Sequence, residues 1–373
     1  MRVMTIVGTR PEIIKLSRVK AVLDTWLDHV IVHTGQNYED ELNEVFFREL
    51  GIRRPDHFLD AAGETASETV GNILIRADAV LAKHKPDALL VLGDTNSCLA
   101  VYPAKRRRVP IFHMEAGNRC FDFRVPEEVN RRIVDHISDI NLVYSEQARH
   151  HLLREGFPPV QVIKTGSPQN EVLRYHAAAI DASSIVSRLN VQRGRYFVVS
   201  AHREENVDDP ERLRKLAESL AAIAERYEFP LIFSCHPRTR RRLAAAKLVP
   251  HELVKIAPPF GFFDYVHLQK HAYCTISDSG TITEESSILG FPAVTVREAH
   301  ERPEGMDEGT VIMTGLGCTR ILESIDVAVK QMEQFGASRT VTDYDVPQVS
   351  WKVAKLILSY TDYINRKIWG RNL

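Results

Sequence analysis

The chain has 373 residues, of which 44% are hydrophobic and 26% are charged, and its formal net charge is −1. This length favours two domains, and the ordinary composition predicts a fully folded protein. The near-neutral charge provides no field to attract nucleic acid or an acidic membrane surface, and no apolar run approaches the roughly 18 residues of a membrane span, so neither partner is expected.

Short apolar runs rich in β-branched residues alternate with helical patterns through the first half of the chain. The helical patterns cover Glu12–Thr25, Ser67–His84 and Glu127–Ser138. Runs that are apolar on both faces and separated by helices are typical of a parallel sheet covered on both sides. The expected strands are Arg2–Val7, Val30–Thr34, Ala88–Gly93, Ile111–Met114, Ile140–Val143 and Val160–Ile163.

The alternation stops over residues 169–194, which we interpret as a linker, and then resumes. We therefore expect an α/β protein with two Rossmann-like, doubly wound domains, residues 1–168 and 195–347, facing a ligand cleft at the carboxyl ends of their sheets. The last helix, within about 348–373, is expected to return to the first domain through its aromatic residues. The second series of strands is Tyr196–Ala201, Leu231–Ser234, Leu253–Ile256, Cys274–Ser277, Ala293–Val296 and Thr310–Met313.

The five cysteines are scattered, without a CxxC pair, and most adjoin expected strands or helix starts. An odd, dispersed set suits small buried hydrophobes in a reducing compartment, so a cytoplasmic location is expected. The apolar run Met1–Gly8 is too short for a signal peptide and is interpreted as the first core strand.

The first strand leads into Gly8–Lys15, which reads GTRPEIIK. Arg10 and Lys15 then lie at or near a helix N-terminus, where a cation opposes the helix dipole and an anionic ligand would compensate. Surface cations on a first helix are the plainer alternative. The GxGxxG dinucleotide pattern and the Walker pattern are both absent.

Three carboxylates follow strand ends or open a helix in the first domain, namely Asp94, Glu115 and Glu127. Asp94 alone could be a helix N-cap, and Glu127 alone could serve the helix dipole. Glu115 stands beside Gly117 at a strand end, where neither capping nor packing explains it. Carboxylates that crowd one sheet edge raise one another's pKa and can act as general acid and base.

In the second domain, His202 and His236 each follow a strand, and the run from Asp278 opens a helix after another strand. Gly280 permits close backbone approach, and Ser279, Thr281 and the helix N–H groups suit a diphosphate, with Glu285 placed to bind a ribose diol. An ordinary βα turn with an acidic first helical turn is the alternative. No metal is expected, because HxxH and HExxH are absent, and the absence of GxSxG argues against a serine hydrolase.

These residues together resemble the non-hydrolysing UDP-N-acetylglucosamine 2-epimerases. The resemblance extends over nearly the whole chain in the order expected for that family, and jointly the segments are specific. The matching segments are Gly8–Lys15, Gly93–Thr95, His113–Gly117 (HMEAG), Pro126–Arg131 (PEEVNR), His202–Glu204, Ser277–Glu285 and Glu301–Glu304.

The resemblance implies a glycosyltransferase-B-like fold, UDP held mainly by the second domain, a homodimer, and a cofactor-free inversion at C2 of a UDP-2-acetamido sugar. UDP leaves to give a 2-acetamidoglycal and adds back after proton exchange at C2. By the resemblance, Asp94, Glu115 and Glu127 supply acid/base chemistry, and His202 acts near the diphosphate or in proton handling. Cations hold the phosphates (Arg10, Lys15, Arg131), and UDP is bound by His236, Ser279, Gly280, Thr281 and Glu285.

Longer segments resemble a branch of that family that forms UDP-N-acetyl-L-fucosamine from UDP-2-acetamido-2,6-dideoxy-L-talose for O-antigen or capsule. They are His33–Phe47, Leu92–Ala100 and Phe112–Asp122. The chain also departs from the parent enzymes at Thr281, at Asn37 and at Asn118–Cys120. These departures disfavour UDP-N-acetylglucosamine as the substrate and a carried-over allosteric site for it.

Three other functions are left open by the sequence. A glycosyltransferase of the same fold would need an acceptor groove, and the three carboxylates favour elimination instead. A hydrolysing 2-epimerase, which releases free sugar and UDP, is a further alternative. A nucleotide-sugar sensor on an inactive enzyme fold is disfavoured by the acid/base candidates at each expected strand end.

Overall fold

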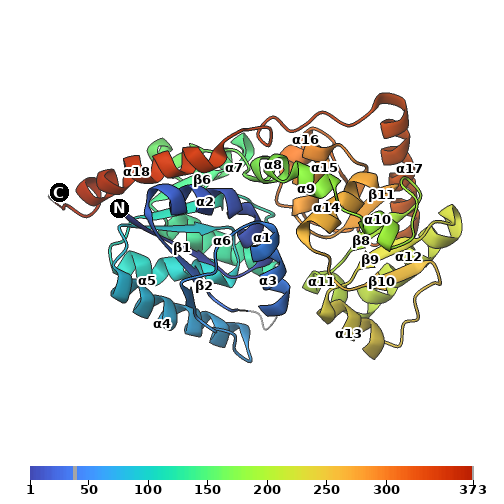
Figure 1. The fold of residues 1–373 in the computed structure, drawn as a ribbon, viewed down its shortest axis with the longest axis horizontal. Coiled ribbons are helices and arrows are strands. Elements are labelled where there is room, and N and C mark those ends of the chain that lie inside the picture. The colour runs from blue at the N-terminus through green and yellow to red at the C-terminus, as the bar shows by residue number, and fades with distance from the viewer. Residues whose placement is uncertain (37–39, 372–373) are drawn as a thin grey trace. The chain divides into compact units, whose positions relative to one another are not determined.

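The computed structural model describes residues 1–36 and 40–371; residues 37–39 and the side chains of residues 40–44, all within the segment His33–Phe47, lie outside the description. The described residues form two compact units, Met1–Tyr175 with Asp343–Leu373 and His176–Thr342 (Figure 1). The division between the units falls within residues 169–194, the segment that the sequence predicts as a linker.

In the described part of the first unit, a seven-stranded parallel sheet has the strand order β3-β2-β1-β4-β5-β6-β7. The order reverses between β1 and β4, and ligands of open α/β sheets bind at the carboxyl edge beside such a switch point. The two-residue strand β3 is too short for a sequence pattern to predict. The strands are β1 (Arg2–Val7), β2 (Asp28–His33), β3 (His57–Phe58), β4 (Ala88–Leu92), β5 (Ile111–Ala116), β6 (Ile140–Val143) and β7 (Val162–Lys164).

The helix predicted over Glu12–Thr25 is wrong in one respect, because the structure divides it at Leu16 into α1 (Arg10–Lys15) and α2 (Ser17–Trp26). Buried apolar residues continue at helical spacing across the break, so the pattern cannot reveal it. The other helices of this unit are α3 (Asp40–Glu49), α4 (Ala66–His84), α5 (Val101–Arg106), α6 (Pro126–Ile137), α7 (Glu146–Arg154), α8 (Gln169–Tyr175) and α18 (Val349–Lys367), with 3₁₀ helices η1 (Asn96–Ala100) and η2 (Pro159–Gln161).

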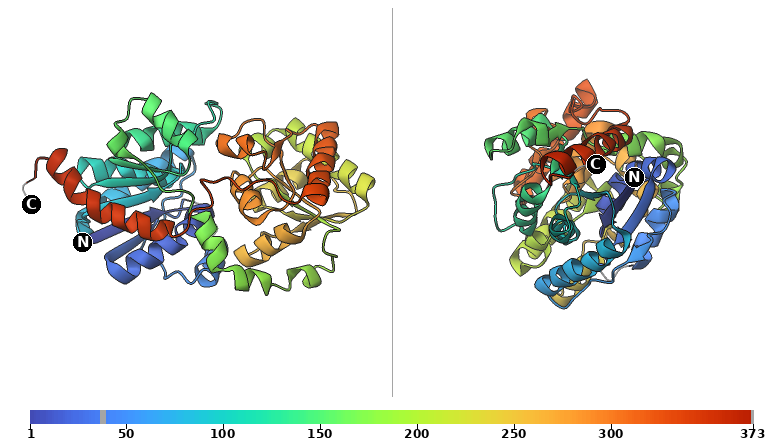
Figure 2. Two further views of the ribbon diagram at one scale, coloured as in Figure 1. Left: turned by 90° about the horizontal axis from the view of Figure 1, so that it is seen from above. Right: turned by 90° about the vertical axis from the view of Figure 1, so that its left-hand side faces the viewer.

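The last helix returns to the first unit, as the sequence predicts. Helix α18 (red) lies beside α2 in Figure 1 and against the same unit in Figure 2. The ring centroids of Trp26 and Trp351 are 6.0 Å apart. The Lys105 Nζ atom lies 5.6 Å from the centroid of the Trp369 ring. Aromatic contacts therefore fasten the end of the chain, while Tyr360 and Tyr363 contact each other.

In the described part of the second unit, a six-stranded parallel sheet has the order β10-β9-β8-β11-β12-β13, which reverses between β8 and β11. The strands are β8 (Phe197–Ser200), β9 (Leu231–Ser234), β10 (Val254–Ala257), β11 (Cys274–Ser277), β12 (Ala293–Thr295) and β13 (Ile312–Met313). The helices are α9 (Ala177–Asp181), α10 (Ile185–Arg188), α11 (Glu204–Val207), α12 (Pro210–Tyr227), α13 (Pro237–Ala245), α14 (Phe262–His271), α15 (Thr281–Leu289), α16 (Pro303–Asp307) and α17 (Cys318–Phe335).

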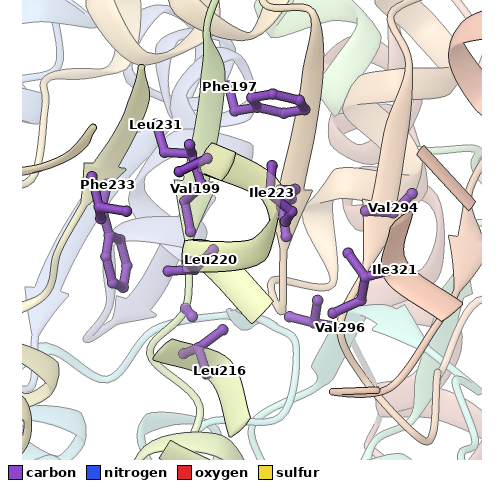
Figure 3. Packing of buried hydrophobic residues seen from close by; sticks show 14 of the residues in the cluster. Phe197, Val199, Leu216, Leu220, Ile223, Leu231, Phe233, Val294, Val296 and Ile321 are labelled. Atoms are coloured by element: carbon purple, nitrogen blue, oxygen red, sulfur yellow. The ribbon is translucent and has the colours of Figure 1, made fainter. Parts of the chain in front are cut away.

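Alternate residues of β8 and β9 face two separate hydrophobic clusters. Phe197 and Val199 pack with residues of α12 and α17, a cluster shown in Figure 3. Val198 and Ile232 pack with residues of α10 and α14 instead. Because successive strand residues point to opposite faces, β8 and β9 are covered on both sides, which explains why these two strands are apolar up to their final serine.

The described helices include none that combines the length and the apolar character needed to cross a membrane.

Candidate active site

The β1–α1 turn is packed tightly against the turn that follows β4. A Cβ atom added to Gly8 would lie 1.9 Å from the Ser97 Oγ atom and 2.2 Å from the Thr34 Oγ1 atom. Glu12 accepts hydrogen bonds from the backbone N–H groups of Gly8 (2.5 Å) and Thr9 (3.0 Å) and from the Thr95 hydroxyl. One carboxylate thus joins two loops beside the switch point of the first sheet.

Two ionisable groups beside these turns have displaced pKa values. Burial raises the pKa of Glu12 to about 7, although its three hydrogen bonds oppose the change. Burial also lowers the pKa of Lys20, in α2, to about 7. The Lys20 Nζ atom has no hydrogen-bond partner among the described residues and lies 5.7 Å from the centroid of the Phe47 ring.

Sequence reasoning missed both of these groups. The Thr9-x-x-Glu12 spacing of a capping box is the signal that would have drawn attention to Glu12, and the structure contains that box. Lys20 carries no comparable signal, because a lysine in a helix is ordinarily exposed.

Glu115 lies at the carboxyl end of β5 in an uncommon backbone conformation. Its φ angle is +64°, and the pairing of β5 with β6 shifts register between Met114 and Ala116. A bulge of this kind redirects a side chain, and left-handed non-glycine residues concentrate at functional sites. The Lys15 Nζ atom lies 2.7 Å from Glu115 Oε2, and both side chains are largely buried. The structure therefore brings together two of the residues predicted from the sequence.

A second pair joins the turn after β4 to α6. Arg131 Nη2 lies 2.7 Å from Asp94 Oδ2, and the Arg131 side chain is 3% exposed. Arg131 Nη1 also donates to Glu128 Oε2 at 3.2 Å. Glu127 is half-buried at the second position of α6, one residue before Glu128. Arg10 is half-buried, with its guanidinium carbon 5.8 Å from the centroid of the Phe46 ring.

In the second unit, Asp278 organises the loop that follows β8. Its buried carboxylate accepts the N–H groups of His202 (3.0 Å) and Arg203 (3.0 Å) and the side-chain amide of Asn206 (3.2 Å). The His202 and His236 rings lie 6.3 Å apart between centroids. His236 caps α13, because its Nδ1 atom accepts the Arg238 N–H at 3.2 Å. Two loops at the carboxyl edge of one sheet thus present neighbouring imidazoles.

The β11–α15 turn lies beside these histidines at the switch point of the second sheet. The hydroxyl oxygens of Ser279 and Thr281 are 3.0 Å apart. A Cβ atom added to Gly280 would lie 2.5 Å from Arg302 Nη1, so a side chain at this position would have to displace the end of that guanidinium. Hydroxyls, helix N–H groups and a guanidinium at one turn form a chemically suitable anion site.

The two glutamates of α15 are buried and have different partners. Glu284 lies 3.1 Å from Arg302 Nη2. Glu285 accepts a hydrogen bond from Gln269 Nε2 at 2.8 Å and is 7% exposed. Glu284 thus holds the guanidinium that lies against Gly280, and this role is invisible to sequence patterns.

The chain is similar in sequence to proteins named as 2-epimerases of UDP-sugars. A family model described as UDP-N-acetylglucosamine 2-epimerase matches residues 20–358. The UDP-N-acetylglucosamine 2-epimerase of Methanocaldococcus jannaschii is 36% identical over 340 residues, which cover 89% of this chain and 93% of that protein. The UDP-2,3-diacetamido-2,3-dideoxy-D-glucuronate 2-epimerase of Pseudomonas aeruginosa is 36% identical over 330 residues, covering 87% and 91%.

Solved structures agree with the fold. The structure of UDP-N-acetylglucosamine 2-epimerase from Rickettsia bellii is 47% identical, with a TM-score of 0.91 and 100% of each chain covered. The M. jannaschii enzyme in complex with UDP-N-acetylglucosamine and UDP is 33% identical, with a TM-score of 0.90 over 96% of this chain and 100% of that chain. The glycosyltransferase-B-like arrangement of two parallel-sheet α/β domains expected from the sequence is thereby confirmed.

Proposed function

Because this chain belongs to the UDP-N-acetylglucosamine 2-epimerase family, a family of isomerases, we propose that it inverts C2 of a UDP-2-acetamido sugar by eliminating UDP and adding it back. The observation that carries the chemistry is the Lys15–Glu115 pair at the bulged end of β5. It places a carboxylate and a cation at the carboxyl edge of the sheet, where acid/base chemistry on an anionic substrate needs them.

The proposed reaction balances without a cofactor. A carboxylate removes the C2 proton while the C1–O bond breaks, so UDP leaves with the bridging oxygen and the sugar becomes a 2-acetamidoglycal. UDP then attacks C1 again, and a proton returns to C2 from the opposite face. We assign the proton transfers to Asp94, Glu115 and Glu127. The positive charges of Arg10, Lys15 and Arg131 stabilise the negative charge that develops on the departing UDP.

We assign UDP to the second unit. The turn of Ser279, Gly280 and Thr281 suits the diphosphate, with His202 and His236 beside it, and Glu285 suits the ribose diol. The supporting contacts are the paired hydroxyls, the neighbouring imidazoles and the Arg302 guanidinium against the glycine. Charge that builds on UDP in the transition state is stabilised best by such fixed donors.

For the sugar, we propose the 6-deoxy series, from UDP-2-acetamido-2,6-dideoxy-L-talose to UDP-N-acetyl-L-fucosamine, as used in O-antigen and capsule. The segments Leu92–Ala100 and Phe112–Asp122 support it, since they resemble the branch with that substrate and contain Asp94 and Glu115. UDP-N-acetylglucosamine is the second candidate, favoured by the names of the R. bellii and M. jannaschii relatives. The P. aeruginosa relative shows by its name that acidic sugars also occur among the chain's relatives.

A substrate panel in D₂O separates these candidates. The purified protein is incubated in turn with UDP-N-acetyl-L-fucosamine, UDP-N-acetylglucosamine and a UDP-2,3-diacetamido uronate, and the C2 proton is followed by NMR. We expect loss of the C2 proton signal and a talo-configured product from the first substrate. Efficient inversion of UDP-N-acetylglucosamine with no reaction of the 6-deoxy sugar would overturn the substrate assignment. Consumption of the UDP-sugar only when an acceptor is present would indicate a glycosyltransferase, and release of free sugar would indicate a hydrolysing enzyme. Either result would overturn the proposed epimerisation.

A further inference from the structure

Helix α6 presents a buried charged face where an apolar face would ordinarily pack. Glu128, Arg131 and Asp135 lie three and four residues apart and therefore share one side of the helix. Each is at most 3% exposed. Buried charges are costly unless they are paired and hydrogen-bonded, so a face of this kind requires partners on the neighbouring elements.

Those partners lie in the loop between Glu115 and α6. The Cys120 N–H donates to Glu128 Oε2 at 3.0 Å. Arg119, with a fully buried side chain, donates to Asp135 Oδ2 at 2.7 Å and lies 2.7 Å from Glu155 Oε2. The loop contains left-handed residues at Glu115 (φ +64°), Gly117 (φ +80°) and Phe121 (φ +56°). At the two non-glycine residues, Glu115 and Phe121, this conformation is strained and persists only where the surrounding structure holds it.

The same face also holds the turn after β4. Arg131 places one nitrogen 2.7 Å from Asp94 Oδ2 and another 3.2 Å from Glu128 Oε2. The other oxygen of Glu128 lies 2.9 Å from Arg132 Nη2. Glu128 therefore contacts both the loop that follows Glu115 and the arginine that holds Asp94.

From these contacts we infer that Glu128 is a positioning residue, which fixes Asp94 through Arg131 and fixes the Glu115 loop through Cys120. This inference rests on the proposed function, since Asp94 and Glu115 are the groups it orients. Glu128 does not exchange protons with the substrate in this account. It determines where the reacting carboxylates stand, and a displacement of about 1 Å in such groups can cost a hundredfold in rate.

Glu128→Gln tests the role with the same side-chain shape, because an amide cannot accept from Cys120, Arg131 and Arg132 together. We expect kcat to fall by about 10- to 100-fold with KM changed less than about threefold. The matched control is Asp139→Asn, which removes another buried carboxylate of this unit. Asp139 directly precedes β6, and its carboxylate is bonded to Lys105 and to the Ile111 N–H at the start of β5. The control variant is expected to lose stability to a similar degree and to keep its activity per folded molecule.

A double-mutant cycle with Asp94→Asn separates positioning from general structural damage. If Glu128 acts through Asp94, Glu128→Gln lowers the C2-exchange rate much less in the Asp94→Asn protein than in the wild type. Equal losses in both backgrounds, or an unimpaired Glu128→Gln enzyme, would overturn the inference. If Glu128→Gln does not fold, Arg131→Lys tests the same connection between Glu128 and Asp94. This change keeps the positive charge but removes the guanidinium that contacts both carboxylates. The C2 proton exchange of the wild-type protein is measured first. If the wild type shows no exchange, the proposed function is contradicted, and the positioning role of Glu128 is not the part that fails.

Discussion

At Glu115 the chain adopts a left-handed backbone that costs on the order of 1–3 kcal/mol. The register shift beside it and the Lys15 ion pair at 2.7 Å show that the surrounding structure supports this conformation. A solvated surface carboxylate would require neither the left-handed backbone and register shift nor a buried ion pair with Lys15. The proposed role in proton transfer accounts for both.

Glu115→Gln is expected to lower kcat at least about 100-fold, the usual effect of removing a general acid or base. It also removes the negative charge that lies 2.7 Å from the buried Lys15 Nζ atom, so the free energy of unfolding should fall by about 3 kcal/mol. Denaturant unfolding and C2 exchange measure the two effects. The double variant Lys15→Met/Glu115→Gln should recover stability without recovering activity. Exchange within about threefold of the wild type in Glu115→Gln would exclude Glu115 from proton transfer.

The buried Lys20 side chain is expected to make the free energy of unfolding depend on pH. Its pKa is lowered from 10.5 to about 7 in the folded state, so between these values the unfolded chain binds more protons and stability rises with pH. Lys20→Met should remove that rise and should stabilise the protein at pH 7 by about 2 kcal/mol, because it replaces a buried amine that has no hydrogen-bond partner among the described residues. Denaturant unfolding from pH 6 to 10 checks both effects, with the exposed Lys83→Met as control. A stability profile of Lys20→Met parallel to the wild type would contradict this account.

At the residue level, the sequence predicts which polar side chains follow strands but not which contacts they make. Strand alternation places Asp94, Glu115 and His202 at sheet edges without any structure. The roles of Glu128 and Glu284 depend on burial between elements distant in the chain, and no local pattern records burial of a charged residue. Glu12 differs, because the capping-box spacing from Thr9 is a local signal for it. Lys15, Arg131, Asp94 and Glu115 are all predicted as site residues from the sequence, whereas the ion pairs Lys15–Glu115 and Arg131–Asp94 become visible only in the fold.

Among the elements, the turns after β1 and β4 depend on each other through Gly8. The Ser97 and Thr34 hydroxyls occupy the space of a Gly8 side chain and are themselves 2.7 Å apart. Glu12 fastens the same turns through Thr95. The position of α1, which carries Lys15, is thus fixed by the packing of the β1–α1 turn as well as by the capping box at its start.

Gly8→Ala should lower the free energy of unfolding by about 2 kcal/mol, since the added methyl forces these hydroxyls apart. Gly71→Ala is the matched control: Gly71 lies inside α4, and a Cβ atom there meets nothing within 4 Å. That change should stabilise the protein by up to about 1 kcal/mol. Thermal unfolding of both variants checks the pair. Equal stability of the two would show that the turn has room for a side chain.

Most elements are predictable from apolar periodicity, and the exceptions have physical causes. The break at Leu16 is hidden because Ile13, Leu16 and Val19 are all buried at helical spacing. Strand β3 is recognised through its pairing with β2 and not through its two residues. Periodicity reports which face is buried, whereas a helix break or a short edge strand depends on the neighbouring element.

For the whole molecule, we assign UDP to the unit His176–Thr342, and the acid/base groups lie in the first unit. Hydrogen exchange with and without UDP tests this division. UDP should slow exchange of the backbone amides from Asp278 to Glu285 and around His202 and His236. Helix α4 of the first unit should be unaffected. Protection confined to the first unit would contradict the assignment of UDP.

In the proposed reaction, the C1–O bond of a UDP-2-acetamido sugar breaks and re-forms while C2 exchanges its proton. One NMR experiment reads both events, using UDP-N-acetyl-L-fucosamine labelled with ¹⁸O at the bridging C1–O position and incubated with the protein in D₂O. We predict deuterium at C2 in the recovered sugar together with movement of ¹⁸O into the non-bridging positions of the diphosphate. Epimerisation with deuterium at C2 and no movement of ¹⁸O would contradict elimination of UDP, and the absence of both changes in each UDP-2-acetamido sugar of the panel would contradict the proposed function.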